Sequence, residues 1–198
     1  MGRILIAIPT FENIMPDTFK SIYGLQRPEG FDLMFDFVRG YDCARARNLI
    51  ASEAIEYGFD YVLMVDSDVI IPPHTLVSML SSPVDLCAAC CPRKNTRNGT
   101  FEVFKLGQRD YVETYTYDEL KALTGKIDVK SGGGGCILIR IDALKQLSRP
   151  YFKYVEYDSG DVLSEDNYFS GKMAEAGFKV QADTGVMIGH AVRGFQWR

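Results

Sequence analysis

The sequence has few of the features that mark membrane, nucleic-acid-binding or exported proteins. The apolar run Ile4–Ile8 stops at Pro9 and is too short for a signal peptide or a membrane span. The net charge is only −4, and Lys and Arg are scattered instead of forming a basic stripe, which argues against nucleic acid as a partner. We therefore expect a cytoplasmic protein with no transmembrane segment.

Cysteine is also sparse. The chain has five, and most of them lie in apolar runs. A buried free thiol behaves as a small hydrophobe, and this distribution fits a reducing compartment. Cys87 and Cys90 have the two-residue gap of a zinc or redox pair. No second pair follows, however, and the run Val84–Cys91 has the pattern of a buried strand. We interpret both thiols as core residues, with the pair as the alternative.

The chain has the length and composition of one globular domain. It has 198 residues, of which 46% are hydrophobic, enough for a substantial buried core. No internal repeat, low-complexity tract or linker divides it. We therefore treat residues 1–198 as a single domain.

The first half of the sequence alternates strand-like and helical patterns. Such alternation is typical of an α/β fold with a mainly parallel sheet flanked by helices. One helix shows apolar residues at helical spacing from Ala46 to Tyr57 and is expected to end at Gly58. The four predicted strands are Arg3–Ile8, Phe31–Val38, Tyr61–Val65 and Val84–Cys91.

After Pro92 the pattern changes to shorter alternating segments. Asn98-Gly99 marks a turn, and Phe101–Leu106 and Tyr111–Tyr117 alternate like the strands of a small antiparallel flap. The remaining predicted elements are a short helix at 117–123, a helix that begins near Ser164, and strands at Lys126–Lys130, Cys136–Ile141 and Val180–Ile188.

Asp66-Ser67-Asp68 places two carboxylates directly after the strand Tyr61–Val65. Open α/β sheets bind ligands at the carboxyl ends of their strands. Mg2+ or Mn2+ accepts one or two protein carboxylates there and takes further ligands from water and substrate phosphates. His190 follows an apolar strand and is a candidate third ligand. The alternatives are that the two Asp residues form a turn and that the histidine is structural.

Two further segments are open to a functional and a structural interpretation. Ser164-Glu165-Asp166 begins the last long helix, where the acids either cap the helix or supply a general base, because the helix dipole favours negative charge there. The run Gly132–Gly135 either lets the backbone approach a ligand or forms a flexible turn. His74 lies beside Pro72-Pro73 and is interpreted as a capping or exposed residue.

Taken in order, these motifs resemble the GT-A glycosyltransferases, especially the inverting family 2. The resemblance covers nearly the whole chain. Because each motif is short, the specificity of the resemblance comes from the order in which the motifs occur. It is carried by Ile8-Pro9-Thr10-Phe11, Ala44-Arg45-Ala46-Arg47-Asn48, Asp66-Ser67-Asp68 (the DXD pattern), Gly132–Gly135, Glu165-Asp166 and Gly177-Phe178-Lys179-Val180.

The resemblance implies an enzyme that transfers a sugar from a nucleoside-diphosphate sugar to an acceptor hydroxyl, with inversion. Asp166 would be the base, supported by Glu165. Asp66, Asp68 and His190 would hold Mn2+ or Mg2+. The donor would contact Pro9, Thr10, Phe11, Arg45, Asn48, Asp66, Ser67, Asp68 and Gly134.

The sequence departs from the family in two places. The second strand ends Val38-Arg39-Gly40, where many members have an acid that contacts the base, so uridine is expected only as the family's commonest choice. The chain also stops soon after His190, where larger relatives continue, and we consider that it is the N-terminal part of a longer protein. Phe195 and Trp197 would stack on a sugar or pack on the domain surface.

Two other functions are compatible with the same residues. Val62–Asp68 also resembles the first motif of haloacid dehalogenase-type phosphatases, although Ile70 departs from that motif and no clear downstream lysine motif follows. A sugar-nucleotide-binding module without catalysis is the other alternative.

Overall fold

The structure is a computed structural model and describes residues 1–93, 99–107 and 113–191. Its centre is a seven-stranded sheet of order β2-β1-β3-β10-β5-β13-β8. β1, β2, β3, β5 and β13 run in one direction, and β10 and β8 run in the other, so the predicted mainly parallel sheet is confirmed. The strands are β1 (Gly2–Thr10), β2 (Phe31–Arg39), β3 (Tyr61–Val65), β5 (Leu86–Cys90), β8 (Lys126–Asp128), β10 (Cys136–Arg140) and β13 (Val180–Met187).

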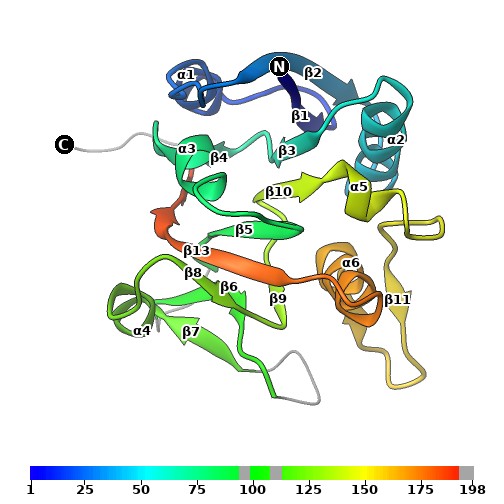
Figure 1. Cartoon of the computed structure of the whole chain (residues 1–198). Helices are drawn as coiled ribbons and strands as arrows, with labels where there is room; N and C mark the ends of the chain where they lie inside the picture. The colour runs from blue at the N-terminus through cyan, green and yellow to red at the C-terminus, as the bar shows by residue number, and fades with distance from the viewer. Residues whose placement is uncertain (94–98, 108–112, 192–198) are drawn as a thin grey trace.

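Helices cover both faces of this sheet (Figure 1). α2, α5 and α6 contribute to one buried cluster, and α1 and α3 contribute to the other. The helices are α1 (Pro16–Tyr23), α2 (Cys43–Glu56), α3 (Thr75–Met79), α4 (Tyr117–Lys121), α5 (Ile141–Leu144) and α6 (Glu165–Glu175). Among the helices of the described ranges, none is long and apolar enough to cross a membrane.

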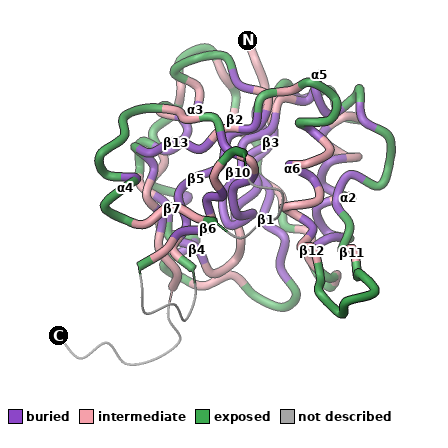
Figure 2. The backbone as a smooth tube through the Cα atoms, turned by 90° about the horizontal axis from the view of Figure 1, so that it is seen from below, coloured by how far each residue is buried: buried purple, intermediate pink, exposed green. Residues whose placement is uncertain are grey.

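The two clusters follow from the alternation of side chains along each strand. In β3, Val62 and Met64 belong to the cluster beneath α2, whereas Leu63 and Val65 belong to the opposite one. Because both faces are covered, the central strands are apolar throughout and appear as the buried interior in Figure 2. This double burial is why the sequence showed continuous apolar runs there.

Cys87 and Cys90 both lie in β5, and their positions in this strand distinguish a core role from a metal or redox pair. The two thiols lie on opposite faces of the strand, in different buried clusters, so they cannot form a chelating pair. All five cysteines are free. The predicted core role is therefore confirmed. Burial raises the pKa of both thiols to about 12, which keeps them protonated.

Short strands form three smaller sheets at the edges. They are β7-β6-β9 (Thr114–Thr116, Thr100–Phe104, Ser131–Gly132), β11-β12 (Val155–Glu156, Val162–Leu163) and β14-β4 (Gly189–His190, Val69–Ile70). β6 and β7 form the predicted antiparallel flap. Tyr117 begins α4 instead of ending a strand, because Thr116 and Glu119 form a capping box. Asn98, Tyr111 and Val112 lie outside the described residues.

Candidate functional site

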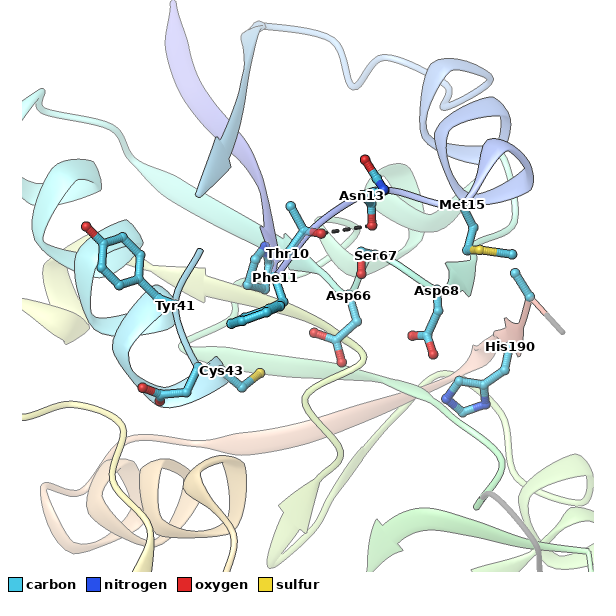
Figure 3. A pocket seen from close by; sticks show the side chains of 13 residues that line it. Thr10, Phe11, Asn13, Met15, Tyr41, Cys43, Asp66, Ser67, Asp68 and His190 are labelled. Carbon is cyan, nitrogen blue, oxygen red and sulfur yellow. Dashed lines mark hydrogen bonds between the residues drawn. The ribbon is translucent and has the colours of Figure 1, made fainter. Parts of the chain in front are cut away.

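Except for Arg45, Asn48 and Gly134, the predicted donor residues meet at the carboxyl ends of β1 and β3. They line a cavity of about 830 Å3, which we call the first cavity. Figure 3 shows the side chains of Asp66, Asp68 and His190 around its floor. Its lining residues are Pro9, Thr10, Phe11, Asn13, Met15, Tyr41, Asp42, Cys43, Asp66, Ser67, Asp68, His190 and Ala191.

The turn after β3 presents the two carboxylates to this cavity. The Asp66 N–H donates to the Gly135 carbonyl at 2.9 Å, and the Asp66 carbonyl accepts from the Val69 N–H at 3.2 Å. Because the chain turns back at once into β4, Asp66 and Asp68 reach the same space instead of opposite faces of the sheet. This arrangement agrees with the predicted position of the pair.

His190 reaches the cavity through the two-stranded pairing of β14 with β4. His190 lies opposite Val69 in this ladder, and the Ala191 N–H donates to the Asp68 carbonyl at 2.7 Å. Nε2 of His190 also lies 3.7 Å from the Cys91 sulfur. Neither β4 nor β14 was predicted as a separate strand, yet their pairing is what brings His190 beside Asp68.

The start of α2 forms the opposite wall. Asp42 caps this helix, because its Oδ1 accepts from the Arg45 N–H at 3.0 Å. The next residue, Cys43, points into the cavity (Figure 3). Burial raises the pKa of the Cys43 thiol to about 12; the positive charge of Arg47 opposes the shift, and nearby Asp66 adds to it. Cys43 is therefore a neutral thiol at the mouth of the site.

A second cavity of about 360 Å3 adjoins the first, and Cys43, Asp66 and His190 line both. Its other walls come from α2, the segment after β5, the flap, the glycine segment, the segment before β11 and α6. They are Arg47, Cys91, Pro92, Arg93, Glu102, Gly133, Gly134, Gly135, Tyr154, Glu165 and Asp166. Burial raises the pKa of Glu102, and the negative charge of Asp166 raises it further.

Asp166 is held in this second cavity by uncharged donors. Its Oδ2 accepts from the Gly134 N–H at 2.8 Å, and its Oδ1 accepts from the Asn167 N–H at 2.8 Å and from the Ser164 hydroxyl. Ser164 occupies the N-cap position of α6, as predicted, but its side chain makes no capping bond to the helix backbone. The hydroxyl orients Asp166 instead.

Glu165 has a different partner, the buried guanidinium of Arg47. Nη1 of Arg47 donates to Oε1 of Glu165, and Nη2 donates to Oδ1 of Asp66 at 2.8 Å and to the Gly134 carbonyl at 2.9 Å. Burial disfavours the charged guanidinium, but the surrounding carboxylates outweigh it and raise the pKa of Arg47. The prediction placed Glu165 beside Asp166 as its support; in the structure the Glu165 carboxylate binds Arg47.

Sequence reasoning gave Arg47 no role. The signal was present, because Arg47 lies on the face of α2 that also carries Ala46 and Ile50, and a charged residue in an apolar helix stripe is almost always paired. Its 1% exposure marks it as a structural centre of the site.

Arg45 and Asn48 line neither cavity. Arg45 is exposed and stacks at 4.5 Å over the ring of Tyr41, which lines the first cavity. Asn48 faces away from the donor side and holds the segment at 151–152, since its Oδ1 accepts from the Tyr151 and Phe152 N–H groups at 2.8 and 3.2 Å. The structure therefore separates these two from the other predicted donor residues.

The glycine segment is packed against protein atoms. A Cβ on Gly132 would overlap Ala88, one on Gly133 would overlap Glu102, and one on Gly134 would overlap the Arg47 guanidinium. All four glycines are buried, and none has positive φ. These three glycines approach side chains of the chain itself, and approach to a ligand stays a prediction. Gly134 faces the second cavity, not the first.

His74 stands at the start of α3 but makes no capping bond. Its Nε2 lies 3.0 Å from the Gly185 carbonyl, so it links α3 to β13. It lines neither cavity. Phe195 and Trp197 lie outside the described residues.

The chemistry of the first cavity suits a hard divalent cation. Asp66 and Asp68 offer carboxylate oxygens, and His190 offers an imidazole nitrogen, to one space. Within the described ranges, no three His, Cys, Asp or Glu side chains are gathered closely enough to form a metal site by themselves. The donor set therefore fits an ion that takes few ligands from the protein and the others from a phosphate and water.

No protein-family model matches the chain, and no curated protein matches its sequence. Solved structures do match. A197 from STIV is similar with a TM-score of 0.62 and 16% identity, over 96% of this chain and 86% of that one. GalNAc-T7, crystallised with UDP, GalNAc and Mn2+, is similar with a TM-score of 0.60 and 12% identity, over 98% of this chain and 45% of that one. S. aureus TarS residues 1–349, in complex with UDP-GlcNAc, is similar with a TM-score of 0.55 and 15% identity, over 99% of this chain and 60% of that one.

The chain spans about half the length of the last two proteins. At these identities the likeness concerns the fold, which agrees with the seven-stranded sheet and its flanking helices. The chain has the GT-A fold that its motifs predicted.

Proposed function

We propose that the protein transfers a sugar from a nucleoside-diphosphate sugar to an acceptor hydroxyl. The observation that carries this proposal is the pair of adjoining cavities. Asp66 and Asp68 line the first, Asp166 lines the second, and Asp66 lines both. A reaction between two bound molecules needs two such sites with a shared boundary, because positioning both reactants removes much of the entropic barrier.

The first cavity is assigned to the donor. Pro9, Thr10 and Phe11 border the nucleotide, and Phe11, which is 70% exposed, offers its ring for stacking. The GT-A structures that resemble this chain contain UDP or a UDP-sugar, which favours uridine as the base. Mn2+ or Mg2+ held by Asp66, Asp68 and His190 would supply positive charge next to the leaving diphosphate.

The second cavity is assigned to the acceptor, with Asp166 as the general base. Three uncharged donors fix the Asp166 carboxylate, and the structure shows no cation of the described residues bonded to it. Asp166 takes the proton of the acceptor hydroxyl as its oxygen attacks the anomeric carbon, and the bond to the diphosphate breaks on the opposite side. This single displacement inverts the anomeric centre.

The first experiment is a thermal-shift panel of nucleoside diphosphates and nucleotide sugars, with and without Mn2+. A ligand at 100 times its Kd stabilises the native state by about 2.7 kcal/mol. We expect one nucleoside diphosphate to raise Tm only with Mn2+. Asp68→Ala should abolish that rise, whereas Asp32→Ala, on the exposed face of β2, should keep it.

A flat panel would contradict the donor assignment. Stabilisation by Mg2+ with a phosphate-mimicking fluoride would instead support the phosphatase alternative. Metal-dependent donor binding without transfer to any hydroxyl acceptor, and without donor hydrolysis, would support a binding module.

A further inference from the structure

Arg47 is a buried cation at the boundary of the two cavities. It is 1% exposed and projects from α2 toward three separate segments of the chain. Its guanidinium donates to the end of β3 at Asp66, to the glycine segment at Gly134 and to the first turn of α6 at Glu165. These segments are far apart in sequence, so one planar group fixes their relative positions.

Gly134 extends this contact to Asp166. The Gly134 carbonyl accepts from Arg47 at 2.9 Å, and the N–H of the same residue donates to Asp166 Oδ2 at 2.8 Å. A Cβ on Gly134 would occupy the place of the guanidinium, so the glycine is what permits this approach. Gly134 therefore links the Arg47 guanidinium to the Asp166 carboxylate through its two backbone groups.

The energetics favour a positional role over a stabilising one. Nε of Arg47 is buried and has no hydrogen-bond partner among the described residues. Burying a charge is costly even when it is paired, and an unsatisfied donor adds to that cost. Apolar side chains in place of both Arg47 and its buried partner Glu165 would avoid both penalties. A benefit other than stability is needed to explain the arginine.

We infer that Arg47 is a positioning residue that fixes Asp66 on the donor side and Asp166 on the acceptor side relative to one another. The inference rests on the proposed function for its catalytic consequence. Arg47 acts through Asp66 and Gly134 and is not itself required to touch either substrate. Its loss should misplace the base while leaving the donor cavity largely intact.

The test compares Arg47→Lys with Arg140→Lys. Lysine keeps the charge but cannot bridge three acceptors with one planar group. Arg140 is the matched control, because it pairs with Asp85 at the opposite end of β10 from the site. A misplacement on the order of 1 Å costs about a hundredfold in rate. We expect Arg47→Lys to lower kcat about a hundredfold with a donor KM within about threefold of wild type, and Arg140→Lys to change neither.

A second measurement is independent of turnover. A double-mutant cycle compares the equilibrium constants of unfolding in urea. It uses the wild type, Arg47→Lys, Asp166→Asn and the double variant. Two residues joined through Gly134 should be non-additive by about threefold or more, whereas unconnected residues add. If Arg47→Lys does not fold, Arg47→Gln replaces it in both measurements, because a single amide with two N–H donors cannot bridge the three acceptors.

The outcomes are distinguishable. An active wild type whose Arg47→Lys variant keeps its kcat, or loses donor affinity and kcat equally, overturns the inference. An additive cycle also overturns it. A wild type without donor binding or transfer overturns the proposed function, and the cycle alone then decides whether Arg47 fixes Asp166.

Discussion

Glu165 and Asp166 are adjacent in the sequence but have different electrostatic surroundings. Arg47 neutralises Glu165, whereas Asp166 accepts, among the residues that the structure describes, only from the Ser164 hydroxyl and from backbone N–H groups. The partners, and not the residue types, therefore distinguish the proposed base from its neighbour.

Asp166→Asn should preserve donor binding and stop transfer. Asparagine retains an oxygen that can accept from the Gly134 N–H but cannot take a proton from a hydroxyl. We expect kcat to fall by about 100- to 10,000-fold, the typical contribution of a general base, with the Mn2+-dependent thermal shift unchanged. Asp128→Asn, on β8 at the far edge of the sheet, is the control. Near-normal turnover by Asp166→Asn would exclude it as the base.

Cys43 should be slow to alkylate despite lining both cavities. Burial raises its pKa to about 12, so at pH 8 only about one thiol in 10,000 is ionised and labelling by iodoacetamide should be about a thousandfold slower than for an ordinary cysteine. The rate should rise about tenfold per pH unit while the protein stays folded. Mass spectrometry locates the label, and Cys43→Ser is the control. Rapid labelling of Cys43 at pH 8 would show that its thiolate is stabilised.

At the scale of elements, strand ends and helix ends place the chemistry. The catalytic candidates come from the turn after β3, the start of α2, the start of α6 and the β14–β4 ladder. Hydrogen bonds tie these ends to neighbouring segments, as the Asp66 N–H is tied to the Gly135 carbonyl. The end of α6, which lies away from the site, depends on the backbone conformation of a glycine. Its contribution to stability can be tested by substitution.

Gly177 ends α6 with φ +84, a left-handed conformation that L side chains rarely adopt. A Cβ there would meet no atom within 4 Å, so the cost of Gly177→Ala is conformational and amounts to about 1–2 kcal/mol. We expect Tm to fall by roughly 2–8 °C. Gly24→Ala is the matched control after α1, because Gly24 has φ −81 and its nearest Cβ contact is 3.4 Å. Equal losses in both variants would contradict this explanation.

At the scale of the whole molecule, the groups proposed to face the donor lie at the carboxyl end of the parallel strands. The carboxyl ends of β1 and β3 meet α2 and β14 there, while α4 lies beside the flap, away from the first cavity (Figure 1). Binding should therefore rigidify a defined set of segments and leave others unchanged.

Hydrogen exchange can map that set. A nucleoside diphosphate with Mn2+ should slow amide exchange at residues 10–15, 66–70 and 189–191, because these line or support the first cavity. Exchange in α4 should not change. Protection that is confined to the flap, or that is independent of the metal, would place the ligand elsewhere.

Much of the fold could be predicted because the sheet is buried on both faces. The apolar run Tyr61–Val65 corresponds to β3 residue for residue, and the helix after Ser164 begins where it was expected. The directions of β8 and β10 and the short pair β4–β14 could not be predicted, because strand direction and two-residue ladders depend on long-range pairing that leaves no local periodicity.

The same division applies to the site. The order of its motifs by itself predicted Asp66, Asp68 and His190 for the donor side and Asp166 for the acceptor side. Ionisable residues that follow an apolar strand or begin a helix can be recognised in the sequence without knowledge of their partners. Only the tertiary structure decided the partners. Arg47 binds Asp66, Gly134 and Glu165, whereas Arg45 and Asn48 turn away, because the rotation of α2 sets which of its side chains face the sheet.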